Sequence, residues 1–141
     1  MIIGFTGTRE GMTDAQKLTV RRIMQGQTDV SLCAHGDCVG ADADFDAICK
    51  EIGFETAALP CYLERLRAHC TKAITQPRDP DIRNRDIVEL ADKMIACPKG
   101  FAEENRHSGT WNTIRMARRS MKKLAIIFPD GKVEVFDEGE L

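Results

Sequence analysis

The sequence has no long apolar run, few aromatic residues and no strong excess of one charge. No apolar run exceeds a few residues, so we expect no membrane span. Aromatic residues make up 6% of the chain, and the formal net charge of −2 gives no global attraction to nucleic acid or to an anionic membrane. The N-terminal residues lack the basic region of a signal peptide, so we expect a cytoplasmic protein.

The six cysteines do not form a recognisable metal-binding or disulfide pattern. None belongs to a CxxC pair, and no second pair completes four ligands with Cys33, His35 and Cys38. We therefore expect free thiols in a reducing compartment, no metal and no cofactor. The chain has 141 residues, 43% of them hydrophobic, and no break in composition. It has the size of one domain, residues 1–141.

Short apolar runs alternate with helical patterns along the chain. We predict five strands at residues 2–5, 30–34, 54–59, 93–97 and 124–128, with a possible extra edge strand at 132–136. We predict helices after a capping box at 13–16, then at 41–52, 62–74, 83–91 and from 110 to about 121, with breaks at Pro77 and Pro80. This alternation predicts an α/β fold, with a mostly parallel five-stranded sheet and helices on both faces.

Glycine-bearing loops follow several of these strands, at the sheet edge where such folds bind ligands. In the first loop, Gly7 lets the backbone approach a ligand closely, and Thr8 and Arg9 offer donors for phosphate or hydroxyls. A plain strand-to-helix turn explains this loop equally well. We retain Gly7, Thr8 and Arg9 as candidate ligand-binding residues.

The second loop precedes a helix whose N-terminus favours anions, yet it is rich in carboxylates. Carboxylates repel phosphate and suit ribose hydroxyls or a base. Helix capping and dipole compensation account for Asp44 and Asp46, whereas the position of Asp42 directly after a Gly-Ala pair favours a ligand role. The candidate ligand-binding residues here are His35, Gly36, Asp37, Gly40, Ala41 and Asp42.

Arginines flank an amide at the start of the predicted helix 83–91. Cations at a helix N-terminus oppose the helix dipole, so a ligand role for Arg83 and Asn84 is favoured over a solvated face.

Another glycine, at the start of the helix from 110, lies between two hydroxyl residues. Gly109 allows close approach, and Ser108 and Thr110 can cap the helix or hold a phosphate. Trp111 could stack on a base or pack in the core. The basic run that ends this helix is interpreted as a solvated face.

Together these motifs resemble the SLOG superfamily, which joins the DprA/Smf proteins, the LOG-type phosphoribohydrolases and small stand-alone relatives of the YspA kind. The resemblance covers Ile3 to about Ala117 and depends on the motifs at 4–9, 35–42, 83–84 and 108–110 in that order. It implies a Rossmann-like, doubly wound fold that binds nucleotides or nucleotide-derived molecules, and a homo-oligomer.

One departure from the LOG pattern, PGGxGTxxE, bears on catalysis. In LOG-type enzymes the glutamate and an upstream arginine serve catalysis, but here the glutamate position holds Thr113, which cannot act as a carboxylate base. Arg83 and Asp42 remain the catalytic candidates, and Glu103 or Glu104 from the insert 101–107 could substitute for the missing glutamate.

Two hypotheses stay open. The protein could bind an ADP-ribose-like molecule or a cyclic nucleotide as a sensor or sequestering protein. Alternatively, it could be an N-glycoside hydrolase or transferase acting on nucleosides or nucleoside monophosphates. Nucleic acid is disfavoured as a partner, because the net charge is acidic.

Overall fold

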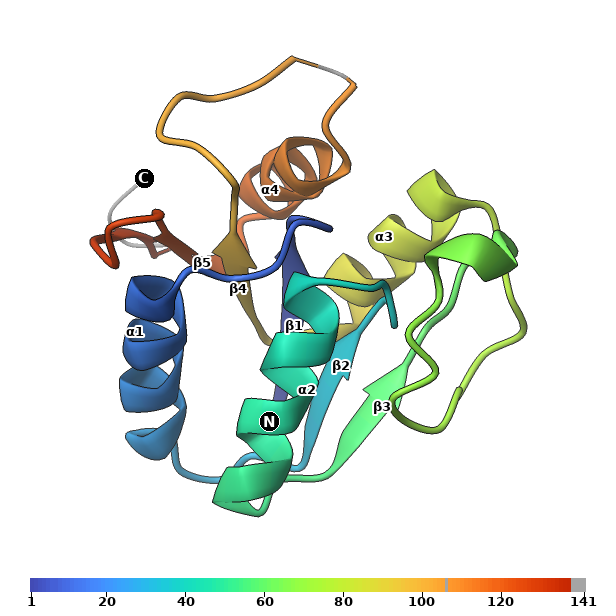
Figure 1. Ribbon diagram of the computed structural model, residues 1–141, viewed down its shortest axis with the longest axis horizontal. Helices are drawn as coiled ribbons and strands as arrows, with labels where there is room; N and C mark the ends of the chain where they lie inside the picture. The colour runs from blue at the N-terminus through green and yellow to red at the C-terminus, as the bar shows by residue number, and fades with distance from the viewer. Residues whose placement is uncertain (106, 138–141) are drawn as a thin grey trace.

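A computed structural model, which describes residues 1–105 and 107–137, places six strands in one sheet (Figure 1). The strands are β1 (Ile2–Gly7), β2 (Leu32–His35), β3 (Thr56–Ala58), β4 (Lys93–Cys97), β5 (Lys123–Ile127) and β6 (Val133–Phe136). Their order is β3-β2-β1-β4-β5-β6, with β1 to β5 parallel and β6 antiparallel at one edge. The predicted parallel sheet and its extra edge strand are both confirmed.

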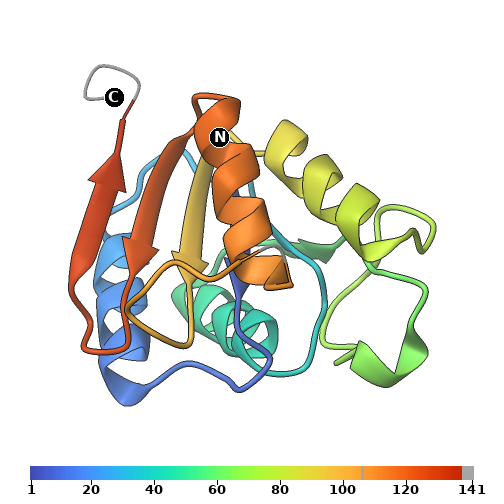
Figure 2. The same ribbon diagram turned by 90° about the horizontal axis from the view of Figure 1, so that it is seen from above.

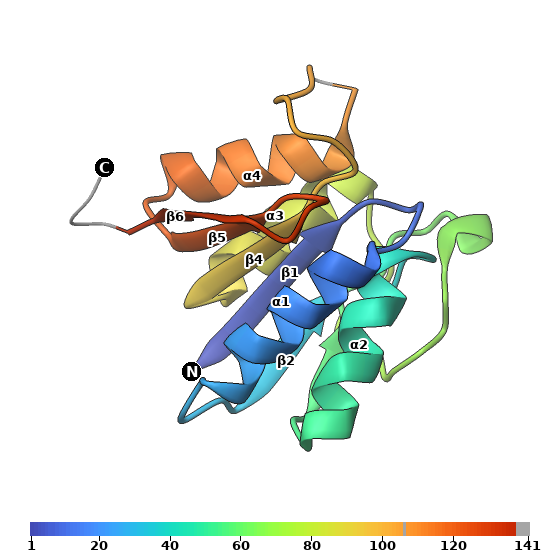
Figure 3. The ribbon, with the colours of Figure 1, turned by 60° about the vertical axis from the view of Figure 1, so that its left-hand side comes forward.

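Within the described residues, four α-helices cover the two faces of this sheet. They are α1 (Asp14–Gln25), α2 (Ala41–Ile52), α3 (Pro80–Leu90) and α4 (Gly109–Arg119). Helices α1 and α2 lie on one face, and α3 and α4 on the other (Figure 3). Figure 2 shows β6 at one edge of the sheet and the β3–α3 connection beyond the other. The arrangement is a Rossmann-like, doubly wound fold.

Each face of the sheet has its own apolar core, because successive strand side chains point to opposite sides. Phe5 of β1 is fully buried toward α1 and α2, where its ring stacks on Phe45 with centroids 4.4 Å apart. Met94 of β4 packs instead with Ile87 of α3 and Trp111 of α4. Burying a side chain of this size contributes roughly 2–3 kcal/mol. The two cores thus fix both helix pairs against the strands.

The predicted helix over 62–74 is wrong. This segment holds only a 3₁₀ turn at Glu64–Leu66, and the left-handed backbone of His69 is incompatible with a continuous helix. Backbone groups that a helix would pair locally bond to the β2–α2 loop instead: Ala68 N–H donates to the Asp37 carbonyl at 2.7 Å. Tertiary hydrogen bonds therefore override the moderate apolar spacing of the segment.

Helix α3 begins earlier than predicted, because Pro80 starts the helix rather than breaking the chain. Asp79 caps the helix by accepting the N–H of Asp81 at 3.1 Å, and Pro80 occupies the first helical position, where no donor is needed. The capping box of α1 is confirmed, with Thr13 and Gln16 bonded reciprocally.

All six cysteines are free thiols. Within residues 1–105 and 107–137, no helix is both long and apolar enough to cross a bilayer.

Candidate functional site

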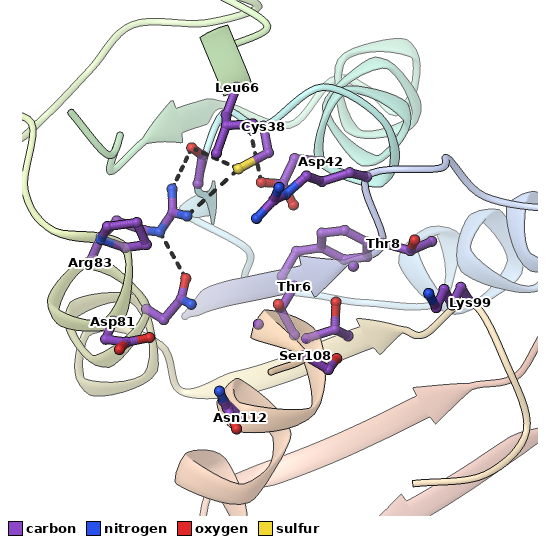
Figure 4. Close-up of a pocket in the computed structure, with 18 of the residues that line it drawn as sticks. Thr6, Thr8, Cys38, Asp42, Leu66, Asp81, Arg83, Lys99, Ser108 and Asn112 are labelled. Atoms are coloured by element: carbon purple, nitrogen blue, oxygen red, sulfur yellow. Dashed lines mark hydrogen bonds between the residues drawn. The ribbon is translucent and has the colours of Figure 1, made fainter. Parts of the chain in front are cut away.

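A cavity of about 770 Å³ opens at the carboxyl edge of the sheet, where the strand order reverses between β1 and β4 (Figure 4). Ligands of doubly wound folds bind at this position. Its walls come from the end of β1 and the loop after it, the β2–α2 loop, the first turns of α3, the loop after β4 and the start of α4.

Backbone hydrogen bonds join the loop after β1 both to β4 and to the start of α2. Thr8 N–H donates to Cys97 O at 3.1 Å, and Ala41 N–H donates to Thr8 O at 2.9 Å. Gly40 has a φ of +96°, and a Cβ there would lie 2.3 Å from the carbonyl oxygen of Arg9. Only glycine fits this conformation and this close approach. Gly40 and Ala41 therefore position the cavity wall, although neither lines the cavity.

Arg83 reaches from α3 across the cavity wall to the β2–α2 loop. Its side chain is buried, and its guanidinium donates to Gly36 O at 2.7 Å, to Asn84 Oδ1 at 2.8 Å and to Cys38 Sγ at 3.6 Å. A Cβ on Gly36 would lie 2.3 Å from Nη1, so the glycine makes room for the guanidinium. Most of the donors of Arg83 are thus engaged within the protein.

Asp42 lies in the first turn of α2, beside the same loop. The side chain is buried, and Oδ2 accepts the backbone N–H of Cys38 at 3.0 Å. Burial raises the pKa of Asp42, although His35 and Arg83 oppose the shift. Burial and the charge of Asp42 also raise the pKa of Cys38 to about 11, so this thiol stays protonated near neutral pH.

The opposite wall is the N-terminus of α4. Ser108 accepts the N–H of Trp111 on its side chain at 3.2 Å and the N–H of Asn112 on its carbonyl at 2.9 Å. The N–H groups of Gly109 and Thr110 lie in the first turn of α4, before the first intrahelical hydrogen bond. This is the end of the helix that favours anions. Figure 4 shows Ser108 and Asn112 on this side of the cavity, opposite Cys38 and Asp42.

The structure brings most of the predicted site residues together. Ten line the cavity: Gly7, Thr8, Arg9, Gly36, Asp42, Arg83, Asn84, Ser108, Gly109 and Thr110. The lining does not include His35, Asp37, Gly40 or Ala41.

His35 and Asp37 belong to a buried network on the other side of the loop. Asp37 accepts hydrogen bonds from Arg67 Nη2 at 3.0 Å and from the backbone N–H groups of His69 and Cys70 at 3.2 and 3.0 Å. Although burial opposes ionisation, the hydrogen bonds from Cys70 and Arg67 lower the pKa of Asp37. Asp37 therefore fastens the β3–α3 connection to the β2–α2 loop.

The same network sets the tautomer of His35. Its Nδ1 accepts the backbone N–H of Asp37 at 2.9 Å, so the ring proton lies on Nε2 and is donated to Asp46 Oδ1 at 2.9 Å. Although burial opposes ionisation, hydrogen bonds from His35, Lys50 and Thr56 lower the pKa of Asp46 to about 2.

His35, Asp46 and Cys70 place one potential metal ligand each within 4.8 Å of one another. A metal on Nε2 would require the ring proton on Nδ1, where it would face the N–H of Asp37. Lys50 Nζ also lies 2.8 Å from Asp46 Oδ2, which adds positive charge. These residues fit a hydrogen-bonded network better than a metal centre.

Several residues of the site were not predicted from the sequence. Glu10, Asp81, Lys99 and Asn112 line the cavity. Lys99 directly follows Pro98, where the sequence predicts that a strand ends. Arg9 also follows the end of a predicted strand, so the same kind of signal could have identified Lys99.

Two residues of α4 answer questions that the sequence leaves open. Trp111 is buried among the core residues and does not line the cavity, so it packs rather than stacks on a base. Thr113, at the position of the LOG-type glutamate, is fully buried and donates to Gly109 O at 2.8 Å.

Comparison with solved structures identifies proteins of the same fold. A molybdenum cofactor binding protein from the phototrophic bacterium Rippkaea orientalis has a TM-score of 0.67 and 20% identity, over 90% of this chain and 76% of that chain. TM1055 has a TM-score of 0.63 and 15% identity, over 87% and 71% of the two chains. DNA processing protein A (DprA) from Streptococcus pneumoniae has a TM-score of 0.63 and 19% identity, over 88% and 49%.

This chain therefore spans about half the length of the Streptococcus pneumoniae DprA. No family model and no curated protein matches the sequence. The structural neighbours share the Rossmann-like fold of this chain.

Proposed function

We propose that the protein binds a nucleotide-derived small molecule in this cavity and acts as a sensor or sequestering protein. The observation that carries the proposal is the placement of ten predicted ligand-binding residues around one cavity at the strand-order reversal. A volume of about 770 Å³ lies within the range of small-molecule sites and accommodates a nucleotide. The molybdenum cofactor binding protein among the structural neighbours supports a small-molecule role for this fold.

The two walls of the cavity suit different parts of such a ligand. The first amides of α4, with Lys99 nearby on the rim, favour an anionic group such as a phosphate. Asp42 favours hydrogen-bond donors such as hydroxyls or amino groups, which a sugar and a base provide. An ADP-ribose-like molecule or a cyclic nucleotide has both kinds of group.

Chromatography of retained ligand tests the proposal. The protein is incubated with adenosine monophosphate, ADP-ribose and 3′,5′-cyclic adenosine monophosphate, separated from free nucleotide and then denatured. We expect one of these nucleotides to be released unchanged in near-stoichiometric amount. Recovery of no nucleotide from the folded protein would contradict the proposal.

Carboxylates around the cavity support a second candidate, an N-glycoside hydrolase or transferase. Glu104 from the insert lines the cavity, as does Glu10, so the LOG-type glutamate has possible replacements. A carboxylate can stabilise an oxocarbenium-like transition state, and a buried acid with a raised pKa, such as Asp42, can donate a proton. Free base in the supernatant of the same incubation is the expected product and would replace the pure binding function.

DNA binding has less support, although DprA proteins share the fold. Arg115 and Arg118 of the basic run bond to Glu103 at 2.9 and 3.2 Å, and Lys122 bonds to the carbonyl of Ala91 at 2.7 Å. Three of its cations are thus engaged within the chain rather than forming an open phosphate track.

A further inference from the structure

We infer that Asp42 and Arg83 together read one neutral group of the ligand, a group that carries a hydrogen-bond donor and an acceptor side by side. The inference rests on the proposed function and gives the ligand role of Arg83 a specific form. In place of a phosphate-binding cation, Arg83 becomes half of a donor–acceptor pair that determines specificity.

Both charged groups approach the same point of the cavity wall from two sides of Gly36. A Cβ on Gly36 would lie 2.3 Å from Arg83 Nη1 and 3.1 Å from Asp42 Oδ2. Both side chains line the cavity, and their exposed fractions are only 6% and 5%. The guanidinium fills the Cβ position of Gly36, so a ligand group that contacts both side chains lies beside it, in a site that excludes most water, where hydrogen bonds to charged groups are strong.

The guanidinium has little donor capacity left for a ligand. Its hydrogen bonds go to Asn84 Oδ1 from Nε, to the carbonyls of Gly36 and Leu59 from Nη1, and to Cys38 Sγ from Nη2. An arginine has five N–H donors, so within the described part of the chain about one N–H of Nη2 remains. One remaining donor suits a single acceptor atom and cannot make the bidentate contact that favours phosphate.

The carboxylate of Asp42 has acceptor capacity to complement that donor. A carboxylate accepts about four hydrogen bonds. The hydrogen bond identified at Asp42 Oδ2 comes from the backbone N–H of Cys38 at 3.0 Å. Capacity thus remains for a donor from the ligand.

A neutral group with adjacent donor and acceptor satisfies both residues without placing a net charge between them. Two parts of a nucleotide have this chemistry, namely the vicinal hydroxyls of the ribose and the amine-and-nitrogen edge of adenine. A phosphate lacks the donor and would face the negative charge of Asp42. We therefore place the phosphate at the opposite wall, on α4.

Titration calorimetry with adenosine monophosphate tests the pair in the full chain. We expect Asp42→Asn and Arg83→Gln each to weaken binding by about 10- to 100-fold. The double variant should lose less than the product of the two factors, because both residues serve one ligand group. Arg85→Gln, which removes an exposed arginine on the same helix, is the matched control and should stay within about threefold of wild type.

Two further probes identify the group that is read. If it is the ribose diol, 2′,3′-dideoxyadenosine monophosphate binds weakly and Asp42→Asn weakens it no further, while ribose 5-phosphate keeps its sensitivity to Asp42→Asn. If it is the adenine edge, ribose 5-phosphate binds weakly and Asp42→Asn weakens it no further, while 2′,3′-dideoxyadenosine monophosphate keeps its sensitivity to Asp42→Asn. If Asp42→Asn weakens adenosine monophosphate, 2′,3′-dideoxyadenosine monophosphate and ribose 5-phosphate equally, the inference is overturned.

The inference and the proposed function can fail separately. Wild-type protein that binds nucleotide, with folded Asp42→Asn and Arg83→Gln variants that match Arg85→Gln, overturns the inference and leaves the proposed function intact. Wild-type protein that binds none of the nucleotides overturns both.

Discussion

The β2–α2 region carries buried carboxylates that behave in opposite ways. Asp37 bonds to the β3–α3 connection and Asp46 bonds to His35 and Lys50, and the pKa values of both carboxyls are lowered because hydrogen bonds outweigh burial. Asp42 faces the cavity, and its pKa is raised because burial outweighs its partners. All three side chains are buried in the same loop-and-helix unit. The difference lies in how strongly burial penalises the charge of each carboxylate and in how many donors the carboxylate meets within the protein.

The direction of the pKa shift separates structural from ligand-binding carboxylates more clearly than residue type does. A carboxylate whose acceptors are satisfied within the chain stabilises the fold and has little left for a ligand. A buried carboxylate with spare capacity in a cavity is costly to the fold, and such groups are functional-site candidates. The predictions below test this separation, from the largest expected effect to the smallest.

Asp37→Ala should have the largest effect on stability. It leaves Arg67 and the N–H groups of His69 and Cys70 without their acceptor, so we expect a loss of about 3–5 kcal/mol in the free energy of unfolding, measured by urea denaturation. Asp81→Ala, which removes an exposed carboxylate, is the control and should change stability by less than about 0.5 kcal/mol. Similar losses in both variants would contradict a structural role for Asp37.

Gly109→Trp should remove ligand binding with little effect on stability. A Cβ at this position meets no atom within 4 Å, so the indole can project into the cavity without disturbing the core. We expect nucleotide affinity to fall more than about 100-fold, which is about 2.7 kcal/mol. Gly100→Trp is the matched control, since that glycine is equally open but lies outside the cavity lining. Retained affinity in folded Gly109→Trp protein would move the site elsewhere.

Asp46→Asn should destabilise the protein in a pH-dependent manner. The folded pKa of about 2 is below the ordinary value of 3.8, so the ionised carboxylate contributes about 2 kcal/mol at neutral pH. That contribution is complete above pH 4 and is lost as the pH falls through 2. Denaturation curves of wild type and variant should therefore converge between pH 4 and pH 2. A pH-independent difference would show that Asp46 acts by packing alone.

Asp42→Asn should have the smallest effect on stability and the opposite sign. Because the folded pKa is raised, the ionised carboxylate costs stability at neutral pH; the cost shrinks as the pH falls below the folded pKa and is gone at the ordinary value of 3.8. The unliganded variant should therefore melt slightly higher than wild type at pH 7, with the difference shrinking in acid. A clearly lower melting temperature at pH 7 would place Asp42 with Asp37 among the structural carboxylates.

The local patterns of the sequence predicted most of the fold. Alternating apolar runs and a capping box at Thr13 identified the strands and α1, because these signals arise within a few residues. The segment 62–74 was mispredicted because its hydrogen bonds run to the distant β2–α2 loop. No local pattern encodes those partners. Pro80 was mispredicted for a simpler reason, since a proline ends a helix or starts one depending on its position.

The sequence predicted which loops form the cavity, because each of them follows a strand. It did not predict which residues of a loop face the cavity. Arg83 and Asp42 line one cavity, since topology brings the carboxyl ends of parallel strands to one edge. His35 and Asp37 come from the same loop, yet they point into the buried network. Which side a loop residue faces depends on backbone angles, such as the left-handed φ of 58° at Asp37, that residue type alone does not determine.

The location of bound nucleotide tests the central claim most directly. Backbone amide chemical shifts of the isotope-labelled protein are followed by NMR as the best-bound nucleotide of the panel is added. We predict the largest changes at Gly36, Cys38, Gly109 and Thr110, on the two walls of the cavity. Amides of the buried network around Asp37 should move less. Changes confined to another surface, such as the β6 edge, would contradict the account.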